Sequence, residues 1–292
     1  MLKNNIALII VNWKQYELTN SCLLSLQNSK CDNIQIILVD NESNKEKLNF
    51  LKNQFNEIVT FSNERNLGFT GANNIGIKYA IKNNFEYVML LNNDTEVNQN
   101  FMVPLIGAFQ KDNNLGAAQP LIMNFFDKKQ VWNAGGSLNN FFGTTTIYKK
   151  QPIKNKKVDW ITGCCMILKK EIFKEVGLLD EDFFAYYEDL DLSLRIKKNG
   201  YNLKLIPSSI IYHHGSKSSQ NQFFEGILSP EVHYLNIRNH LLVIKKHFSD
   251  FNFLGVVFFQ FFKITSYFIY FLIRLRFNKF KMVFKGLGDG LK

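Results

Sequence analysis

Three carboxylates lie close together in the middle of the chain, directly after a run of aromatic residues. Glu188, Asp189 and Asp191 follow the segment 183–187, whose four aromatic side chains would exclude water. Residues 188–198 have the pattern of a short helix, with acids in the first turn, cations toward the end and a glycine after it. Because a helix N-terminus is the positive end of the helix dipole, Glu188 and Asp189 would stay ionised there, as a general base must. The same pattern also fits a capped surface helix without chemistry.

Three short apolar runs in the first third of the chain each end in a polar cluster. The clusters begin at Asn12, Asp40 and Asn92. Such near-continuous apolar runs suit strands that are buried on both faces of a parallel sheet, and helical patterns separate them. This alternation predicts an α/β fold with a doubly wound, mostly parallel sheet. Because ligands bind outside the carboxyl ends of such strands, Asn12, Asp40 and Asp94 are expected to converge on one crevice.

Two further features are candidates for binding phosphate or metal. Glycines at positions 68, 71 and 76 open a helical pattern, and a helix N-terminus of this kind can hold a phosphate or a nucleotide edge. A tight turn is the alternative interpretation. His213 and His214 end a strand pattern, and either a metal ligand or a capped loop histidine would fit that position.

Composition indicates a folded chain with basic character. Hydrophobic residues make up 46% of the 292 residues, charged residues 21%, and the net charge is +10. Basic residues without acids at positions 274–285 follow an apolar segment, which indicates a membrane surface before a nucleic acid. The four cysteines form no C-x-x-C pair, so we expect them to be reduced and mostly buried, and the protein to be cytoplasmic. No signal peptide pattern is present at the N-terminus.

The apolar segment 251–273 is about long enough to span a bilayer, but Lys263 lies near its middle. Polar residues recur along it at steps of three and four, so they form one stripe with the aromatic residues elsewhere. This pattern predicts a helix that lies in the membrane interface, and a core helix is the alternative. We expect a catalytic domain at residues 1–225 and an amphipathic, basic helical extension at residues 226–292.

An ordered series of short motifs extends over nearly the whole chain. They read Val-Asn-Trp from Val11, Val-Asp-Asn-Glu-Ser from Val39, Asn-Leu-Gly-Phe from Asn66, Leu-Asn-Asn-Asp-Thr from Leu91, Trp-Ile-Thr-Gly-Cys from Trp160, Phe-Ala-Tyr-Tyr-Glu-Asp-Leu-Asp-Leu from Phe184, His-His-Gly-Ser from His213, Tyr-Leu-Asn-Ile-Arg-Asn from Tyr234 and Lys-Gly-Leu-Gly-Asp-Gly-Leu from Lys285. In this combination the chain resembles the family 2 glycosyltransferases, and among them the rhamnosyltransferase-like enzymes of bacterial surface-polysaccharide (O-antigen or capsule) assembly.

The resemblance implies a GT-A fold and inverting transfer of a sugar, rhamnose or another hexose, from a nucleoside diphosphate donor. It implies that Asp189 is the base, with Glu188 beside it, and that Asp94 binds Mg²⁺ or Mn²⁺ together with His213 or His214. The residues that it implies for binding the nucleotide sugar are Val11, Asn12, Asp40, Asn66, Gly68, Asn73, Asn92, Asn93, Trp160 and Gly163.

The expected partners are a UDP- or dTDP-linked sugar, a glycan or polyprenyl-linked acceptor and the inner face of the plasma membrane, with no nucleic acid.

Two positions depart from the family pattern. Asn92 stands where many relatives have aspartate, which leaves Asp94 as the one firm anionic ligand, and Asn41-Glu42 replaces the commoner Asp-Gly, which leaves the nucleotide base open. The alternatives are a metal-dependent nucleotidyltransferase and a non-catalytic lipid- or nucleic-acid-binding protein, the latter on the basis of the net charge.

Overall fold

The computed structural model describes residues 5–31, 33–42, 44–215, 225 and 228–292. Ser43 and Ser216, the last residues of two motifs quoted above, lie outside the described residues. By their internal contacts the residues form two units. The first consists of residues 1–136, 147–184 and 188–215, and the second of residues 137–146, 185–187 and 216–292.

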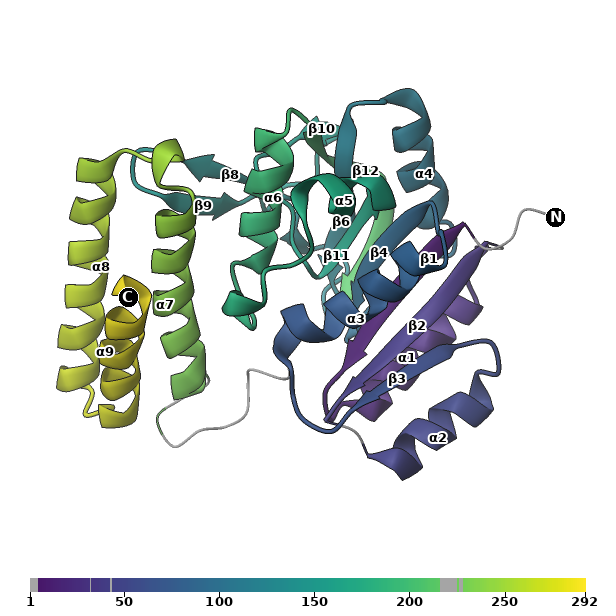
Figure 1. The fold of residues 1–292 in the computed structure, drawn as a ribbon, viewed down its shortest axis with the longest axis horizontal. Coiled ribbons are helices and arrows are strands. Elements are labelled where there is room, and N and C mark those ends of the chain that lie inside the picture. Colours follow the sequence, from purple (N-terminus) through teal and green to yellow (C-terminus); the bar gives the residue numbers. More distant parts are fainter. Residues whose placement is uncertain (1–4, 32, 43, 216–224, 226–227) are drawn as a thin grey trace. The chain divides into compact units, whose positions relative to one another are not determined.

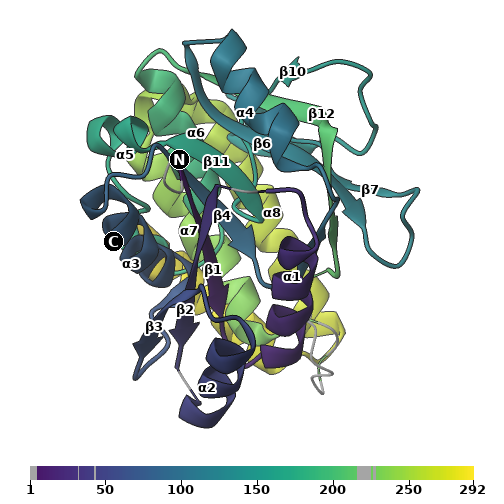
Figure 2. The same ribbon diagram turned by 90° about the vertical axis from the view of Figure 1, so that its right-hand side faces the viewer.

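The first unit is built around one mixed sheet whose strands follow the order β10-β12-β6-β11-β4-β1-β2-β3 (Figures 1 and 2). Strands β1, β2, β3 and β4 are parallel, β12 is parallel to β6, and β11 runs antiparallel between β6 and β4. The strands are β1 (Ile6–Asn12), β2 (Ile34–Asn41), β3 (Val59–Asn63), β4 (Tyr87–Asn92), β5 (Thr95–Val97), β6 (Leu115–Asn124), β7 (Val131–Asn133), β10 (Lys156–Lys157), β11 (Cys165–Lys169) and β12 (Asn202–His213).

Helices cover both faces of this sheet (Figure 2). One buried apolar cluster joins α1, α2 and α4 to one face, and a second joins α3, α5 and α6 to the other. The helices are α1 (Tyr16–Gln27), α2 (Lys45–Gln54), α3 (Gly68–Lys82), α4 (Met102–Lys111), α5 (Lys170–Val176), the 3₁₀ turn η1 (Glu181–Phe183) and α6 (Glu188–Lys198). The expected α/β fold with apolar strands buried on both faces is therefore confirmed.

The second unit is a bundle of α7 (Pro230–Lys246), α8 (Phe253–Ile273) and α9 (Phe277–Leu291), with a hairpin of β8 (Gly136–Asn139) and β9 (Thr144–Ile147) and the turn η2 (Phe248–Asp250) (Figure 1). Its apolar core is formed by Ile237, Ile264, Phe271 and Val283. Ser229 caps α7 by accepting a hydrogen bond from the Val232 N–H, and Pro230 occupies the first turn, where no N–H donor is needed.

Helix α8 turns part of its polar stripe inward. Gln260 and Lys263 contact the His240 ring of α7, and the Lys263 ammonium lies 2.7 Å from Nδ1 of that ring. Burial lowers the pKa of Lys263 to about 8. The opposite face exposes aromatic side chains, with Phe258 59% and Phe261 63% exposed. Among the described residues, α8 is one helix that is long and apolar enough to cross a membrane, judged by length and composition alone.

Candidate active site

The sheet register brings the predicted polar clusters together at one edge. Asn12 pairs with Asp40 across β1 and β2, and Val11 pairs with Asn92 across β1 and β4. Because these strands are parallel, their carboxyl ends and the residues that follow them meet at this edge. The expected convergence of Asn12, Asp40 and Asp94 therefore follows from the pairing.

Asn12 and Asp40 form the centre of a buried hydrogen-bond network. The Asn12 amide donates to Asp40 Oδ1 over 2.6 Å, and the Tyr16 hydroxyl donates to Asp40 Oδ2 over 2.8 Å. Asn93 joins the network by donating to the Thr19 hydroxyl over 3.0 Å. Burial raises the pKa of Asp40, and the bonds from Asn12 and Tyr16 oppose that rise. This network links the carboxyl ends of β1 and β2 to α1 and to the residue that follows β4.

Tyr16 and Thr19 were not singled out from the sequence. A signal for them exists, because both lie within seven residues of Asn12 at the start of the helix that leaves the same sheet edge. Tyr16 also accepts the Asn44 backbone N–H over 2.7 Å, so its hydroxyl links two loops of the crevice.

The glycine-containing loop before α3 is held by asparagine side chains. Asn41 donates to Asn66 Oδ1 over 2.7 Å, and Asn66 accepts the Gly68 N–H over 2.8 Å. Gly68 has φ +74°, and a Cβ there would lie 2.4 Å from the Phe184 carbonyl oxygen, so only glycine fits. Asn73 is buried in α3, where its amide donates to the Phe69 carbonyl of the preceding turn. A tight turn and a helix N-terminus are thus both present at this loop.

The loop 160–164 lies opposite the Asn-Asn-Asp motif. Cys165 pairs with Leu91 across β11 and β4, and the Asn92 N–H donates to the Cys164 carbonyl over 2.8 Å. Trp160 is buried, and its indole N–H has no hydrogen-bond partner among the described residues. This loop therefore carries Gly163 to the strand end at which Asp94 lies.

Asp189 receives two backbone N–H groups at the start of α6. Gly163 donates to its Oδ2 over 3.1 Å, and Leu190 donates to its Oδ1 over 2.8 Å. A Cβ at position 163 would lie 3.2 Å from the Phe69 ring and 3.4 Å from the Glu188 carboxylate, which explains the glycine. The backbone therefore fixes the orientation of the Asp189 carboxylate, and the buried Glu188 precedes it.

Two opposing effects act on the pKa of Asp189. The helix N-terminus favours the ionised carboxylate, whereas burial raises the pKa and outweighs the hydrogen bonds from Gly163 and Leu190. A raised pKa suits a group that must accept a proton near neutral pH. Asp191 has a different role, because it pairs with Arg195 over 2.7 Å, and Arg195 donates to the Leu178 carbonyl.

Asp94 and His213 form a buried pair at the same edge. His213 Nε2 lies 3.2 Å from Asp94 Oδ1, and the exposed fractions of the two residues are 2% and 5%. This close approach lacks the alignment of a hydrogen bond, so both ring nitrogens of His213 and Oδ1 of Asp94 have no hydrogen-bond partner among the described residues. Buried polar atoms without partners are costly, and a divalent cation would satisfy them. This pair fits a metal, although the described residues contain no group of three or more His, Cys, Asp or Glu side chains arranged for one.

The Asp94 and Asp189 carboxylates both act electrostatically on Cys164, the residue after Gly163. Burial raises the pKa of the Cys164 thiol well above its usual range, and the negative charges of Asp94 and Asp189 add to that rise. His214 differs from His213, because it faces Glu96 at 3.4 Å and stacks on Phe125. Of the two histidines, His213 is therefore the one whose ring meets Asp94.

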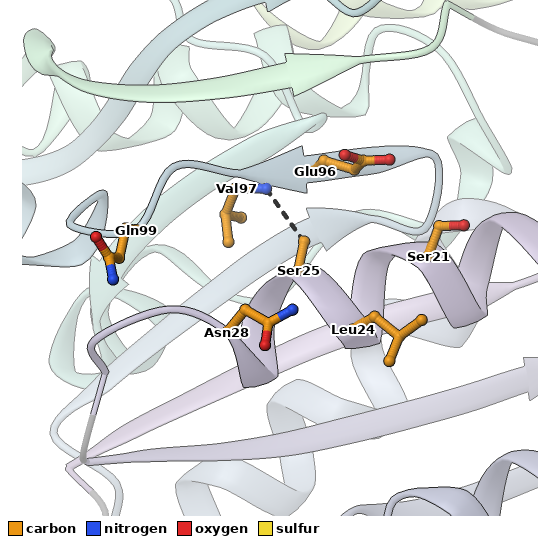
Figure 3. Close-up of a pocket in the computed structure, with 7 residues that line it drawn as sticks. All are labelled: Ser21, Leu24, Ser25, Asn28, Glu96, Val97 and Gln99. Carbon is orange, nitrogen blue, oxygen red and sulfur yellow. Dashed lines mark hydrogen bonds between the residues drawn. The ribbon is translucent and has the colours of Figure 1, made fainter.

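A separate cavity of about 460 Å³ lies along α1 and β5 (Figure 3). Hydroxyl, amide and carboxylate groups line it, and Ser25 accepts the Val97 N–H there over 3.1 Å. Its lining residues are Ser21, Leu24, Ser25, Asn28, Glu96, Val97 and Gln99. None of the residues predicted for the donor or the metal lines this cavity, so the candidate site is instead the group of polar residues gathered at the strand ends.

The model of the family described as Glycosyl transferase family 2 matches residues 7–177, more than half of the chain. The chain belongs to this family. The match covers the strands that carry Asn12 and Asp40, the turn that carries Asp94 and the loop that carries Gly163. The resemblance to family 2 that the motifs carried is thereby confirmed.

Two relatives align with most of the chain. The low-salt glycan biosynthesis hexosyltransferase Agl10 of Haloferax volcanii is 27% identical over 249 residues, which are 84% of this chain and 77% of the relative. The dTDP-rhamnosyl transferase RfbF of Shigella flexneri is 25% identical over 252 residues, 84% of this chain and 82% of the relative. The family match and these relatives show the expected activity, which is glycosyl transfer from a nucleotide sugar in glycan biosynthesis.

A solved structure shares the fold. GalNAc-T7, crystallised with UDP, GalNAc and Mn²⁺, superposes with a TM-score of 0.63 at 20% sequence identity over 84% of this chain. The chain spans about half the length of that protein, with 48% of it covered. The similarity confirms the expected GT-A-like architecture of a mixed α/β fold around a mostly parallel sheet.

Proposed function

We propose that this family 2 enzyme inverts the anomeric centre of the sugar it transfers, with Asp189 as the base. The observation that carries the proposal is the Asp189 carboxylate, held by the Gly163 N–H on the loop opposite Asp94. In a single displacement the acceptor hydroxyl oxygen attacks the anomeric carbon, the bond to the diphosphate oxygen breaks, and the hydroxyl proton passes to Asp189. A second carboxylate as nucleophile is not needed in this reaction.

We further propose that the enzyme depends on a divalent cation, Mg²⁺ or Mn²⁺. Asp94 and His213 would hold it, and when bound it would offset the negative charge that develops on the leaving nucleoside diphosphate. The unpartnered, buried atoms of these two residues support this role. Phosphate oxygens of the donor and water would supply the other ligands, because Asn92 cannot contribute a charge.

The donor would be a UDP- or dTDP-linked hexose such as rhamnose, in keeping with the dTDP-rhamnosyl transferase among the relatives. Asn12, Asp40 and the loop 66–73 would hold its nucleoside, Val11 and Asn92 would flank the crevice, and Asn93, Trp160 and Gly163 would contact the diphosphate or the sugar. The buried, unpartnered indole N–H of Trp160 supports a polar ligand there.

The acceptor would be a glycan or a polyprenyl-linked glycan at the inner face of the plasma membrane. The support is α8, which turns Gln260 and Lys263 inward and exposes Phe258 and Phe261. A large exposed apolar face marks an interaction surface, and basic residues follow it in the sequence. Peripheral attachment through α8 and α9 would bring the cytoplasmic enzyme to a lipid-linked substrate.

The test is a screen of UDP-, dTDP- and GDP-linked hexoses with Mn²⁺, with Mg²⁺ and with EDTA. We expect one nucleotide to raise the melting temperature only when metal is present, and its sugar to be released or transferred. Proton NMR of the first-formed product should show the anomer opposite to the donor. Retained configuration would contradict the proposal that Asp189 is the base of a single displacement. Equal stabilisation by the nucleotide in EDTA would contradict the proposed metal dependence.

A further inference from the structure

The segment directly before the proposed base has a strained backbone. Phe184, Tyr186 and Tyr187 have φ values of 62°, 70° and 70°, in the left-handed region that side chains other than glycine rarely adopt. Such conformations persist only where surrounding contacts enforce them, and they cluster at functional sites. Glu188 and Asp189 follow at once, so the direction in which α6 starts depends on this segment.

One side chain of α7 holds this segment. The amide nitrogen of Asn239 donates to the Ala185 carbonyl over 2.7 Å and to the Tyr186 carbonyl over 2.8 Å. Asn239 is completely buried. Its side-chain oxygen accepts the Arg238 Nε–H over 2.9 Å, which fixes the orientation of the amide and leaves both N–H groups for the two carbonyls.

The next residue on α7 holds the next residue of the segment. His240 stacks on Tyr187, with ring centroids 5.1 Å apart and an interplanar angle of 15°. The His240 ring is itself fixed, because Nε2 lies 2.6 Å from the Gly143 carbonyl and Nδ1 lies 2.7 Å from the Lys263 ammonium. With Nε2–H donating to the carbonyl, Nδ1 is the acceptor, so the ring is neutral and keeps one tautomer.

The other end of the segment is held by α3. The Phe184 carbonyl accepts the Thr70 N–H over 3.1 Å. The turn is thus held on both sides of its strained residues, and one amide binds both the Ala185 and the Tyr186 carbonyls.

We propose that Asn239 is a positioning residue for glycosyl transfer, which holds residues 185–187 in the conformation from which α6 begins and so aims Asp189 at the crevice. The role of Asp189 rests on the proposed function. The conformational role of Asn239 does not, and it follows from the hydrogen bonds and the strain alone. The motif from Tyr234 to Asn239 would therefore have a positioning role, which is separate from donor binding.

Two variants and a matched control test this. Asn239→Asp keeps the shape but replaces the N–H donors with oxygen, and Asn239→Leu removes the donors without adding charge. Asn236→Asp lies one turn earlier on α7 and makes the same exchange. Among the residues that the structure describes, the Asn236 amide donates within its own helix, to the Val232 carbonyl. Circular dichroism and thermal melting first establish that each variant folds, and the Leu variant serves if the Asp variant does not.

Hydrogen exchange followed by mass spectrometry on a peptide that covers residues 184–190 is the direct measurement. Exchange should be at least tenfold faster in both Asn239 variants than in the wild type and unchanged in Asn236→Asp. Turnover of the nucleotide sugar that the wild type accepts should fall ten- to a hundredfold in kcat, while KM for that donor stays within about threefold. A residue that only stabilised the fold would not separate kcat from KM in this way.

Two results would overturn the proposal. Unchanged exchange at residues 184–190 in both Asn239 variants would remove the conformational role, whatever the enzyme's substrate. Faster exchange with unchanged kcat would remove the positioning role. A wild-type protein that turns over no nucleotide sugar would instead count against the proposed function, and the exchange measurement would still decide what Asn239 does.

Discussion

At the residue scale, the reaction depends on which carboxylate takes the proton. Asp189→Asn should keep the fold and donor binding, because an asparagine oxygen can still accept the Gly163 N–H. Turnover should fall by about two orders of magnitude or more, as expected when a general base is lost. Steady-state kinetics with the identified donor measure this. Asp182→Asn, an exposed acid six residues from Glu188, is the control, and near-normal turnover in Asp189→Asn would mean that another residue is the base.

The raised pKa of Asp189 predicts the pH dependence of the reaction. The base must be ionised, so kcat/KM should fall as the pH drops through the raised pKa, at a higher pH than an exposed aspartate would give. The folded protein binds this proton more tightly than the unfolded chain, so ionising Asp189 at higher pH costs stability. Asp189→Asn should therefore melt at a higher temperature than the wild type at neutral pH. An acid limb at the pH of an exposed aspartate would contradict the shift.

The metal pair makes a separate prediction. Asp94→Ala should abolish the metal-dependent part of nucleoside diphosphate binding, because the protein carboxylate of the site is lost. His213→Ala should weaken that binding less, since a neutral imidazole contributes no charge. Isothermal titration of UDP and dTDP with Mn²⁺ and with EDTA measures both. The assignment fails if Asp94→Ala binds the nucleotide with the same metal dependence as the wild type.

At the element scale, the glycine at position 286 allows α9 to approach α7. A Cβ at Gly286 would lie 2.8 Å from the Tyr234 carbonyl oxygen and 3.3 Å from Ile237 Cβ, whereas a Cβ at Gly288 would meet nothing within 4 Å. Gly286→Ala should lower the free energy of unfolding by about 1–3 kcal/mol through overpacking. Gly288→Ala should raise it by about 0.5–1 kcal/mol, because alanine favours a helix over glycine.

Urea denaturation of the two variants compares the same chemical change at two positions of one helix. Equal effects would show that α9 does not pack closely on α7 at Gly286. The Tyr234 hydroxyl donates to Asp289 over 3.1 Å in the same interface, so the two C-terminal motifs found in the sequence meet each other.

The elements that have a clear local sequence pattern could be predicted. Apolar runs placed β1, β2 and β4, and the acid-to-base order placed α6 at residues 188–198. The full length of β6 and the continuity of β12 were not predicted, because Pro120 and Pro207 interrupt their strand patterns. The hydrogen bond from Asn239 to the Ala185 carbonyl joins residues that are 54 positions apart in the sequence. A repeating pattern of apolar residues cannot predict such a contact.

The candidate site was predictable to the extent that strand ends determine it. Parallel strand pairing was enough to predict that the polar residues meet at one edge of the sheet. It was not enough to predict the hydrogen-bond partners of each side chain. The raised pKa of Asp189 was not predicted, because the dipole of a helix can be inferred from the sequence and the burial of its first turn cannot.

At the scale of the whole molecule, the exposed aromatic face of α8 and the basic residues after it predict reversible binding to anionic membranes. Reversing the exposed charges of Arg274 and Lys281 to glutamate should weaken binding to phosphatidylserine-containing vesicles by roughly thirtyfold or more, at about 1 kcal/mol for each basic residue. Binding to neutral phosphatidylcholine vesicles should change little. Co-sedimentation measures both, with Lys52→Glu and Lys111→Glu as the charge-matched control.

The mode of attachment has its own test. An interfacial helix is held reversibly, so high salt or alkali should release part of the full-length protein from membranes, whereas a spanning helix would resist both. A full-length protein that stays in solution without detergent and ignores anionic vesicles would show that α8 serves another purpose.

The hairpin of β8 and β9 and residues 185–187 are encoded within the catalytic half of the chain yet belong to the helical unit. A Cβ at Gly255 would lie 2.2 Å from the Phe141 carbonyl oxygen, and the Asn252 N–H donates to the Asn140 carbonyl over 2.9 Å. The C-terminal helices are therefore not an exchangeable cassette. A chimaera that grafts the helices of a relative onto this chain must transplant all three segments together, and sequence drift at residues 140–143 should be correlated with drift at residues 251–256.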